Sequence, residues 1–198
     1  MEETKRIHEV VTLGEWLWKT AMYMRYGYVR YALRTIPASK DPSAIASKLI
    51  LHYDCTYNRG IRQQRRTKGI ANVVLLCFQH QILLLATDGK HPEFEKIDSL
   101  RFSELPLQCS GYSIGIKQSK PCIQMTNRRF RAIKKQLDWM ALHDRNRVTR
   151  YMKEISPFSF KGVSDQRWKL IQMVNKKRKK AGLPRIRWSD ISPISNTK

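Results

Sequence analysis

Three groups of Lys and Arg residues have the clearest chemical consequence in this sequence. Such side chains bind the phosphates of nucleic acids, and the counterions that they release drive association. The first group contains Arg59, Arg62, Arg65, Arg66 and Lys68. The second group contains Arg128, Arg129, Arg131, Lys134 and Lys135. The third group contains Lys176, Lys177, Arg178, Lys179 and Lys180, with Arg185 and Arg187 shortly after it. We expect these residues to contact nucleic acid.

A basic cluster also has an ordinary structural explanation. Cations are stabilised in the last turn of a helix by the helix dipole, which is where the third group is expected to lie. That group also matches a nuclear-localisation pattern, which is a weak signal in any basic protein. However, an ordinary solvated helix mixes charges of both signs, and the helix expected from Asn127 offers only Asp138 as a counter-charge. The absence of compensating acids therefore favours phosphate binding.

Aromatic residues lie among some of these cations. Trp188 follows Arg185 and Arg187, and we add it to the expected binding residues. Indole and phenol rings beside arginines suit stacking on unpaired bases. Four tyrosines also flank Arg25 and Arg30, namely Tyr23, Tyr26, Tyr28 and Tyr31. For these tyrosines, packing in the core is the more common role, so both interpretations stay open.

One acidic segment offers a different chemistry. Asp88, His91, Glu93 and Glu95 follow the end of an apolar run, where a loop can present side chains. Carboxylates and a histidine could hold a divalent metal and activate water for phosphodiester cleavage. The alternative is a turn at Asp88, followed by glutamates in the first turn of a helix. We favour this alternative and keep the four residues as catalytic candidates only for a rival hypothesis.

Other catalytic and cofactor signatures are missing from the sequence. It contains no glycine-rich phosphate loop, no serine nucleophile elbow and no zinc-protease helix motif. The cysteines Cys55, Cys77, Cys109 and Cys122 lack the paired spacing of a zinc site. We therefore expect no cofactor and no metal, and a non-enzymatic role is favoured.

The first half of the sequence predicts an alternation of helices and strands. Thr12 is expected to cap a helix that runs to about Arg25. A strand is expected over 28–36, and a helix capped by Asp41 over 42–53. The apolar runs 70–78 and 81–87 predict a hairpin at the centre of a sheet. A short helix is expected over 92–100, and the basic run 59–69 fits either a helix or a loop.

The second half predicts one more hairpin and then helices. Strands are expected over 107–117 and 121–125, joined by a short turn. Helices are then expected from Asn127, over 144–155, and from a Ser164 cap to Ala181. Gly182 and Leu183 suit the end of the last helix. The final residues, 189–198, are polar and are expected to fray.

These elements indicate an α+β protein with a mainly antiparallel sheet of about five strands and flanking helices. A change in composition near Thr126 divides the chain into a sheet-containing part, 1–126, and a basic helical part, 127–198. We expect both parts to pack as one domain, because the helical part is short and highly charged.

Composition limits the classes of protein to which this chain can belong. The 198 residues carry 38 Lys and Arg against 16 Asp and Glu, which gives a net charge of +22. A hydrophobic share of 41% is enough for a core. Neither a long uncharged apolar run nor a secretory signal is recognisable, so we expect a cytoplasmic protein that makes no membrane contact. A nucleoid-associated or nuclear location stays open.

Together, these patterns predict a nucleic-acid-binding protein that acts through phosphate contacts. RNA, or a structured nucleic acid, is slightly favoured over duplex DNA, because the sequence contains no recognisable module that reads a groove. Proteins of this general kind serve as accessory subunits of ribonucleoproteins or mobile elements, so a larger protein–nucleic acid complex is expected. Two rivals remain: a metal-dependent nuclease or strand-transfer enzyme, and an interaction subunit that docks on an acidic protein.

Overall fold

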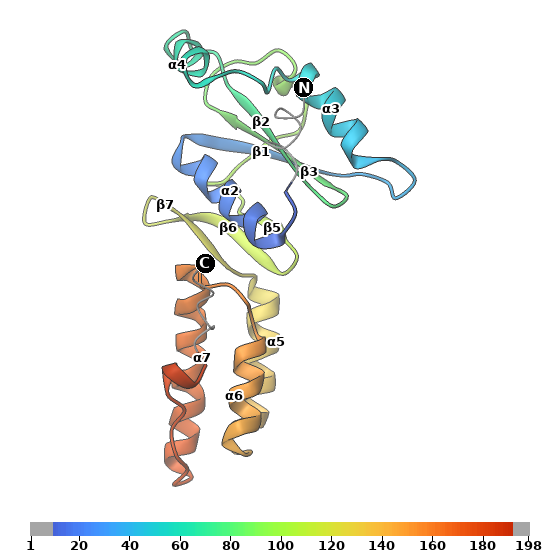
Figure 1. The fold of residues 1–198 in the computed structure, drawn as a ribbon. Coiled ribbons are helices and arrows are strands. Elements are labelled where there is room, and N and C mark those ends of the chain that lie inside the picture. The colour runs from blue at the N-terminus through green and yellow to red at the C-terminus, as the bar shows by residue number, and fades with distance from the viewer. Residues whose placement is uncertain (1–9, 192–198) are drawn as a thin grey trace. The chain divides into compact units, whose positions relative to one another are not determined.

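The structure, a computed structural model, describes residues 10–191 and has the predicted α+β class (Figure 1). The described residues form two compact units. Unit 1 contains the residues up to Leu107 together with Ile114–Pro121. Unit 2 contains Gln108–Ser113 and the residues from Cys122 onward. The expected division of the chain into the parts 1–126 and 127–198, packed as one domain, stays a prediction.

Unit 1 is built on an antiparallel four-stranded sheet with the strand order β2-β3-β1-β4. Its strands are β1 (Tyr28–Thr35), β2 (Val73–Phe78), β3 (Gln81–Thr87) and β4 (Leu100–Arg101). The hairpin predicted from the two apolar runs is present, with Val73 opposite Ala86 and Phe78 opposite Gln81. The prediction that this hairpin is central is wrong for β2, which lies at the edge of the sheet.

The apolar composition of β2 follows from burial of both of its faces. One face joins a core cluster that includes Leu75 and Leu84, and helix α3 (Pro42–His52) adds Ala46 to this cluster. Leu76 and Leu83 on the other face are fully buried as well. A strand buried on both faces needs continuous apolar sequence rather than alternation. This is why the run resembled a central strand.

The first two helices begin at their predicted caps. In α2 (Leu13–Arg25), the Thr12 side chain accepts a hydrogen bond from the Glu15 N–H at 3.2 Å. In α3, Asp41 accepts two backbone N–H bonds of the first turn, at 3.0 and 3.2 Å. These side chains satisfy backbone donors that would otherwise lack intrahelical partners.

In unit 1, the structure decides one prediction that the sequence left open and corrects another. The basic run forms a helix, α4 (Arg59–Thr67). The helix expected over 92–100 is reduced to a single 3₁₀ turn, η1 (Phe94–Lys96). Leu100 and Arg101 instead pair with β1 as strand β4, so the sheet takes the backbone groups that a helix would have used.

The second sheet has three strands where a single hairpin was expected. They are β5 (Leu107–Cys109), β6 (Tyr112–Lys117) and β7 (Lys120–Met125), in that order. The expected strand over 107–117 breaks because Ser110 and Gly111 adopt positive φ values of 47° and 80°. Two successive residues in the left-handed region make a tight hairpin turn.

The described residues of unit 2 form three helices and a 3₁₀ turn. They are α5 (Asn127–Met140), α6 (Arg145–Glu154), α7 (Lys161–Lys180) and η2 (Trp188–Asp190). Helices α5 and α6 begin after Thr126 and Asp144, as predicted. Helix α7 begins three residues before the predicted Ser164 cap, after Phe160, which provides no capping side chain. The Ser164 hydroxyl instead donates to the Ser159 carbonyl.

Helix α7 ends as predicted. Gly182 has a φ of +68°, and its N–H donates to the Lys179 carbonyl at 3.2 Å. The Leu183 N–H donates to the Arg178 carbonyl at 2.9 Å. These two bonds form a Schellman motif, which turns the chain back along the helix. Of the segment expected to fray, residues 192–198 lie outside the described residues.

In the part of the chain that the structure describes, no helix has both the length and the apolar character needed to cross a membrane.

Candidate nucleic-acid interface

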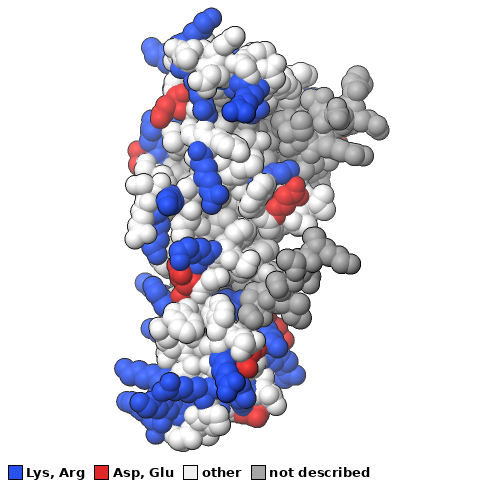
Figure 2. Space-filling view, turned by 60° about the vertical axis from the view of Figure 1, so that its left-hand side comes forward, with Lys and Arg blue, Asp and Glu red and all other residues white. Residues whose placement is uncertain are grey.

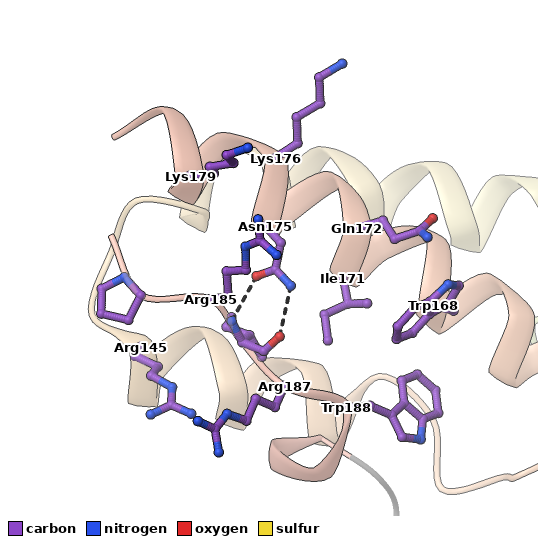
Figure 3. Close-up of a pocket in the computed structure, with 12 residues that line it drawn as sticks. Arg145, Trp168, Ile171, Gln172, Asn175, Lys176, Lys179, Arg185, Arg187 and Trp188 are labelled. Carbon is purple, nitrogen blue, oxygen red and sulfur yellow. Dashed lines mark hydrogen bonds between the residues drawn. The ribbon is translucent and has the colours of Figure 1, made fainter. Parts of the chain in front are cut away.

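A groove in unit 2 brings together cations and two indole rings (Figure 3). It lies between α7, from Trp168 onward, and the returning segment 184–188, and its volume is about 920 Å³. We call it the α7 groove. Its lining residues are Arg145, Trp168, Ile171, Gln172, Asn175, Lys176, Lys179, Pro184, Arg185, Ile186, Arg187 and Trp188.

The returning segment is fixed to α7 by backbone-directed hydrogen bonds. The Asn175 amide donates to the Ile186 carbonyl and accepts from the Ile186 N–H, both at 2.9 Å (Figure 3). Arg178 Nε donates to the Pro184 carbonyl at 2.7 Å. Together with the Schellman turn, these bonds hold the wall that carries Arg185 and Arg187. The groove is therefore a preformed surface.

The charge of the groove is almost entirely positive. Five of its lining residues are cationic and none is acidic. Arg145 forms an ion pair with Asp190 beside the groove, and the Arg187 N–H donates to the same carboxylate at 2.8 Å. These hydrogen bonds lower the pKa of Asp190. Among the described residues, Lys176, Lys179 and Arg185 form no ion pair.

Two indole rings lie together at one end of the groove, and Arg145 and Arg187 lie toward the other end (Figure 3). The ring centroids of Trp168 and Trp188 are 5.7 Å apart, with an interplanar angle of 67°. Trp168 is 49% exposed. An exposed indole beside cations is a platform for an unpaired base.

The Trp188 ring is positioned from inside unit 2. The Arg167 guanidinium lies over this ring, 5.8 Å from its centroid. Arg167 is 1% exposed and donates to the carbonyls of Met152 and Ile191. Burial lowers the pKa of Arg167. A buried cation against the aromatic face fixes the orientation of the ring.

The structure separates the third basic group into different environments. Lys176, Lys179, Arg185, Arg187 and Trp188 line the groove. Lys180 is exposed outside the groove lining. Lys177 forms an ion pair with Asp138 at 2.7 Å.

Arg178 differs from the other candidate residues of this group, because its side chain is buried. It is only 2% exposed, and Arg178 Nη1 donates to the carbonyls of Ala141 and His143 at 3.0 and 2.9 Å. Its guanidinium thus supports the fold and does not line the groove. In the sequence, it could not be told apart from its exposed neighbours in the same basic run.

The second basic group lies along α5. Arg128, Arg131, Lys134 and Lys135 are exposed, whereas Ile133, Leu137 and Met140 are buried. Arg129 departs from the expectation: its guanidinium lies 4.6 Å from the Tyr112 ring centroid, and Nη2 donates to the Ile155 carbonyl at 2.7 Å. Arg129 therefore acts within unit 2.

The first basic group lies on α4 in unit 1. Arg59, Arg62 and Arg66 line a second cavity of about 510 Å³, which we call the α4 pocket. Lys68 is exposed but does not line it. Arg65 turns inward, because Nη2 donates to the Ala71 carbonyl at 3.0 Å and the guanidinium lies 4.6 Å from the Tyr57 ring centroid. The remaining lining residues are Met22, Tyr23, Tyr26, Tyr28 and Gln63.

The acidic segment is not arranged as a metal site. Asp88 pairs with Arg101, and Glu95 pairs with Arg30, both at 2.9 Å. Glu93 contacts Lys96 at 2.7 Å and His52 at 3.1 Å. No set of three His, Cys, Asp or Glu residues in the described chain is placed to hold a metal ion. The carboxylates instead pair with separate cations of unit 1.

His91 lies in the interior, not at a reaction site. It is 3% exposed, and its Nδ1 accepts the Phe94 N–H at 3.3 Å. Burial lowers its pKa, so the imidazole stays neutral and able to accept this bond. Its role is to fix the turn before η1.

Trp168 was missed by sequence reasoning, although a signal for it existed. It lies eight residues before Lys176, and Gln172 lies halfway between them. Residues spaced by four share one face of a helix, so a projection of α7 would have placed Trp168 above the basic run.

Comparison with protein-family models, curated proteins and solved structures yields no match to this chain.

Proposed function

We propose that this chain binds nucleic acid, with RNA slightly favoured, and that the α7 groove is its principal contact surface. The observation that carries the proposal is the lining of the groove: five cations, two tryptophans and no carboxylate. The cations would neutralise backbone phosphates, and the exposed face of Trp168 would stack on a base.

The positive charge of the surface as a whole supports the same ligand. Figure 2 shows Lys and Arg outnumbering Asp and Glu on the face that it draws, with a dense group toward the C-terminal end of α7. A net charge of +22 strongly attracts a polyanion. The ligand need not be sequence-specific, because phosphate contacts carry no base information.

The test is binding of the full chain to unrelated RNA and DNA oligonucleotides across a salt series. The logarithm of the association constant should fall steeply with the logarithm of salt concentration, with a slope of about −0.7 for each phosphate contact to a single strand. A flat plot, or no binding at low salt, would contradict the proposal.

Matched variants assign the binding to the groove. We expect Trp168→Leu to weaken binding to unpaired strands about 10-fold, since base stacking is worth roughly 1–3 kcal/mol. We expect Lys179→Gln to reduce the salt slope by about one contact. Trp139→Leu and Lys153→Gln are the controls, because both residues are exposed in unit 2 and do not line the groove.

A further inference from the structure

The α4 pocket in unit 1 contains a buried polar group that lacks a partner. Tyr28 lines the pocket and is only 2% exposed. Its hydroxyl is buried and forms no hydrogen bond with any described residue. The Tyr23 ring packs edge-on against Tyr28, with centroids 5.2 Å apart. A phenylalanine would fill the same space without leaving a polar atom unsatisfied, so the hydroxyl points to a ligand.

The pocket also concentrates positive charge. Arg59, Arg62 and Arg66 line it, and none of them forms an ion pair within residues 10–191. The sequence has no acidic residue between Asp54 and Asp88. The charge of these arginines is therefore not compensated locally, and a phosphate is the matching group.

Helix α4 is held in place by hydrogen bonds that its residues donate to, or accept from, neighbouring segments. It contains no buried residue. The Asn72 amide donates to the Arg62 carbonyl at 2.9 Å, and Arg65 donates to the Ala71 carbonyl at 3.0 Å. Arg66 donates to the Tyr26 carbonyl at the end of α2. These anchors fix the arginines of α4 beside the tyrosines of α2 and β1.

An exposed aromatic surface completes the pocket. Tyr26 is 59% exposed, so its ring is available for stacking. Burial of Tyr23 raises the pKa of its hydroxyl. The volume of about 510 Å³ lies within the range of small-ligand sites, about 300–1,000 Å³.

We propose that the α4 pocket holds one unpaired nucleotide. Its phosphate is bound by Arg59 and Arg62, its base stacks on Tyr26, and its base edge or sugar bonds the Tyr28 hydroxyl. The inference rests on the proposed function in one respect, that this nucleotide belongs to a bound strand. It adds a second site and a preference for unpaired over duplex nucleic acid.

The experiment measures fluorescence anisotropy of a short, labelled oligouridylate titrated with the full chain. Removing the Tyr28 hydroxyl tests the proposal most directly. We expect Tyr28→Phe to weaken binding about 2- to 10-fold, as for the loss of one hydrogen bond. Resistance of the free protein to urea should be unchanged or higher. A purely structural hydroxyl would leave binding unchanged.

Two further variants test the phosphate and base contacts. Arg62→Gln should reduce the salt slope by about one contact, and Tyr26→Leu should weaken binding about 10-fold. Arg34→Gln is the matched control, because Arg34 is exposed in unit 1 outside the pocket. Normal binding by Tyr28→Phe, Arg62→Gln and Tyr26→Leu would overturn the proposal.

The outcomes separate this proposal from the proposed function. If the α7-groove variants weaken binding while the three α4-pocket variants bind normally, only the nucleotide pocket is refuted. If the wild-type chain binds no oligonucleotide, the proposed function fails as well.

Competition identifies the source of the nucleotide. Displacement of the labelled strand by a free nucleoside monophosphate, lost in Tyr28→Phe, shows that a single nucleotide is sufficient. No displacement, with the variant effects on the strand intact, shows that the pocket takes its nucleotide from a strand. Both results support the pocket.

Discussion

Adjacent cationic residues of α7 have opposite environments. Arg178 is buried and bonds three backbone carbonyls, whereas Lys179 is exposed and lines the groove. The guanidinium has five donors in a rigid fork, which suits it to collect several carbonyls in one place. A basic run can therefore combine a buried structural residue with exposed residues that line a groove.

Substitution of these neighbours should separate stability from binding. Arg178→Met leaves buried carbonyls without their donor, and we expect it to lower the free energy of unfolding by about 3 kcal/mol. Lys179→Met should change that free energy by less than about 0.5 kcal/mol while weakening nucleic-acid binding. Urea unfolding and anisotropy titrations measure the two effects. Equal stability of the two variants would contradict the assignment of Arg178.

Burial of His91 makes unit 1 sensitive to mild acid. The folded state holds the pKa of His91 below its usual 6.5, so the unfolded chain binds more protons as pH falls through that value. Stability is therefore retained above about pH 6.5 and declines on acidification until the lower pKa of the folded state is reached.

The corresponding measurement is urea unfolding between about pH 7.5 and 5.5, the range in which histidines titrate. His91→Gln should show a weaker loss of stability across this range than the wild type. His80→Gln, at an exposed position, should keep the wild-type dependence. If His91→Gln loses stability with falling pH as steeply as the wild type does, groups other than His91 cause the pH dependence.

At the scale of elements, one glycine controls how α7 packs in unit 2. A Cβ on Gly162 would lie 2.4 Å from the Ile123 carbonyl oxygen and 2.8 Å from Cys122 Sγ. The first turn of α7 therefore lies directly against the backbone of β7, which only glycine permits.

We expect Gly162→Ala to destabilise the chain by about 3 kcal/mol, at the upper end of overpacking costs. Gly182→Ala is the comparison: it strains a φ of +68° but meets no atom within 4 Å, so about 1 kcal/mol is expected. Thermal unfolding ranks the two variants. The reverse order would show that α7 can shift away from β7.

The helices and strands also show which sequence signals were sufficient to predict the secondary structure. Thr12 and Asp41 cap their helices as predicted, because a capping side chain acts on its own first turn. Thr126 and Asp144 cap α5 and α6 in the same way. Local chemistry was insufficient at Phe160, which starts α7 without a side-chain bond. It was insufficient for β2 as well, because strand order depends on distant pairing.

The candidate site was predictable only in part, for a related reason. Charge density pointed to Lys176, Lys179, Arg185 and Arg187, and these residues do line one groove. Sequence does not show which way a side chain turns, so Arg129 and Arg178 were included with the others. The partnerless Tyr28 hydroxyl depends on a tertiary arrangement, and no local pattern reveals it.

At the scale of the whole molecule, the net charge of +22 should act on folding and binding in opposite directions. Salt screens repulsion among like charges and so stabilises the free protein, while it weakens contacts with phosphate. We expect the thermal midpoint of the free chain to rise between about 50 and 200 mM salt. Over the same range, the affinity for nucleic acid should fall.

Thermal scans and anisotropy titrations in matched buffers measure both trends. A short polyanion added at low salt should raise the midpoint, because it binds the folded state. A midpoint that falls with salt would show that attractive ion pairs, such as Arg30 with Glu95, dominate the electrostatics of the fold.

Helix α4 buries no side chain, and this has a consequence for local motion. Hydrogen bonds at Arg62, Arg65 and Arg66 attach the helix to the rest of unit 1, and none of its residues is buried. Segments with little buried apolar surface open at a free-energy cost well below that of global unfolding. Backbone amides in 59–67 should therefore take up deuterium sooner than those of β2 and β3. A nucleotide bridging α4 to the tyrosines would slow that uptake, because it would add contacts that opening of the helix must break.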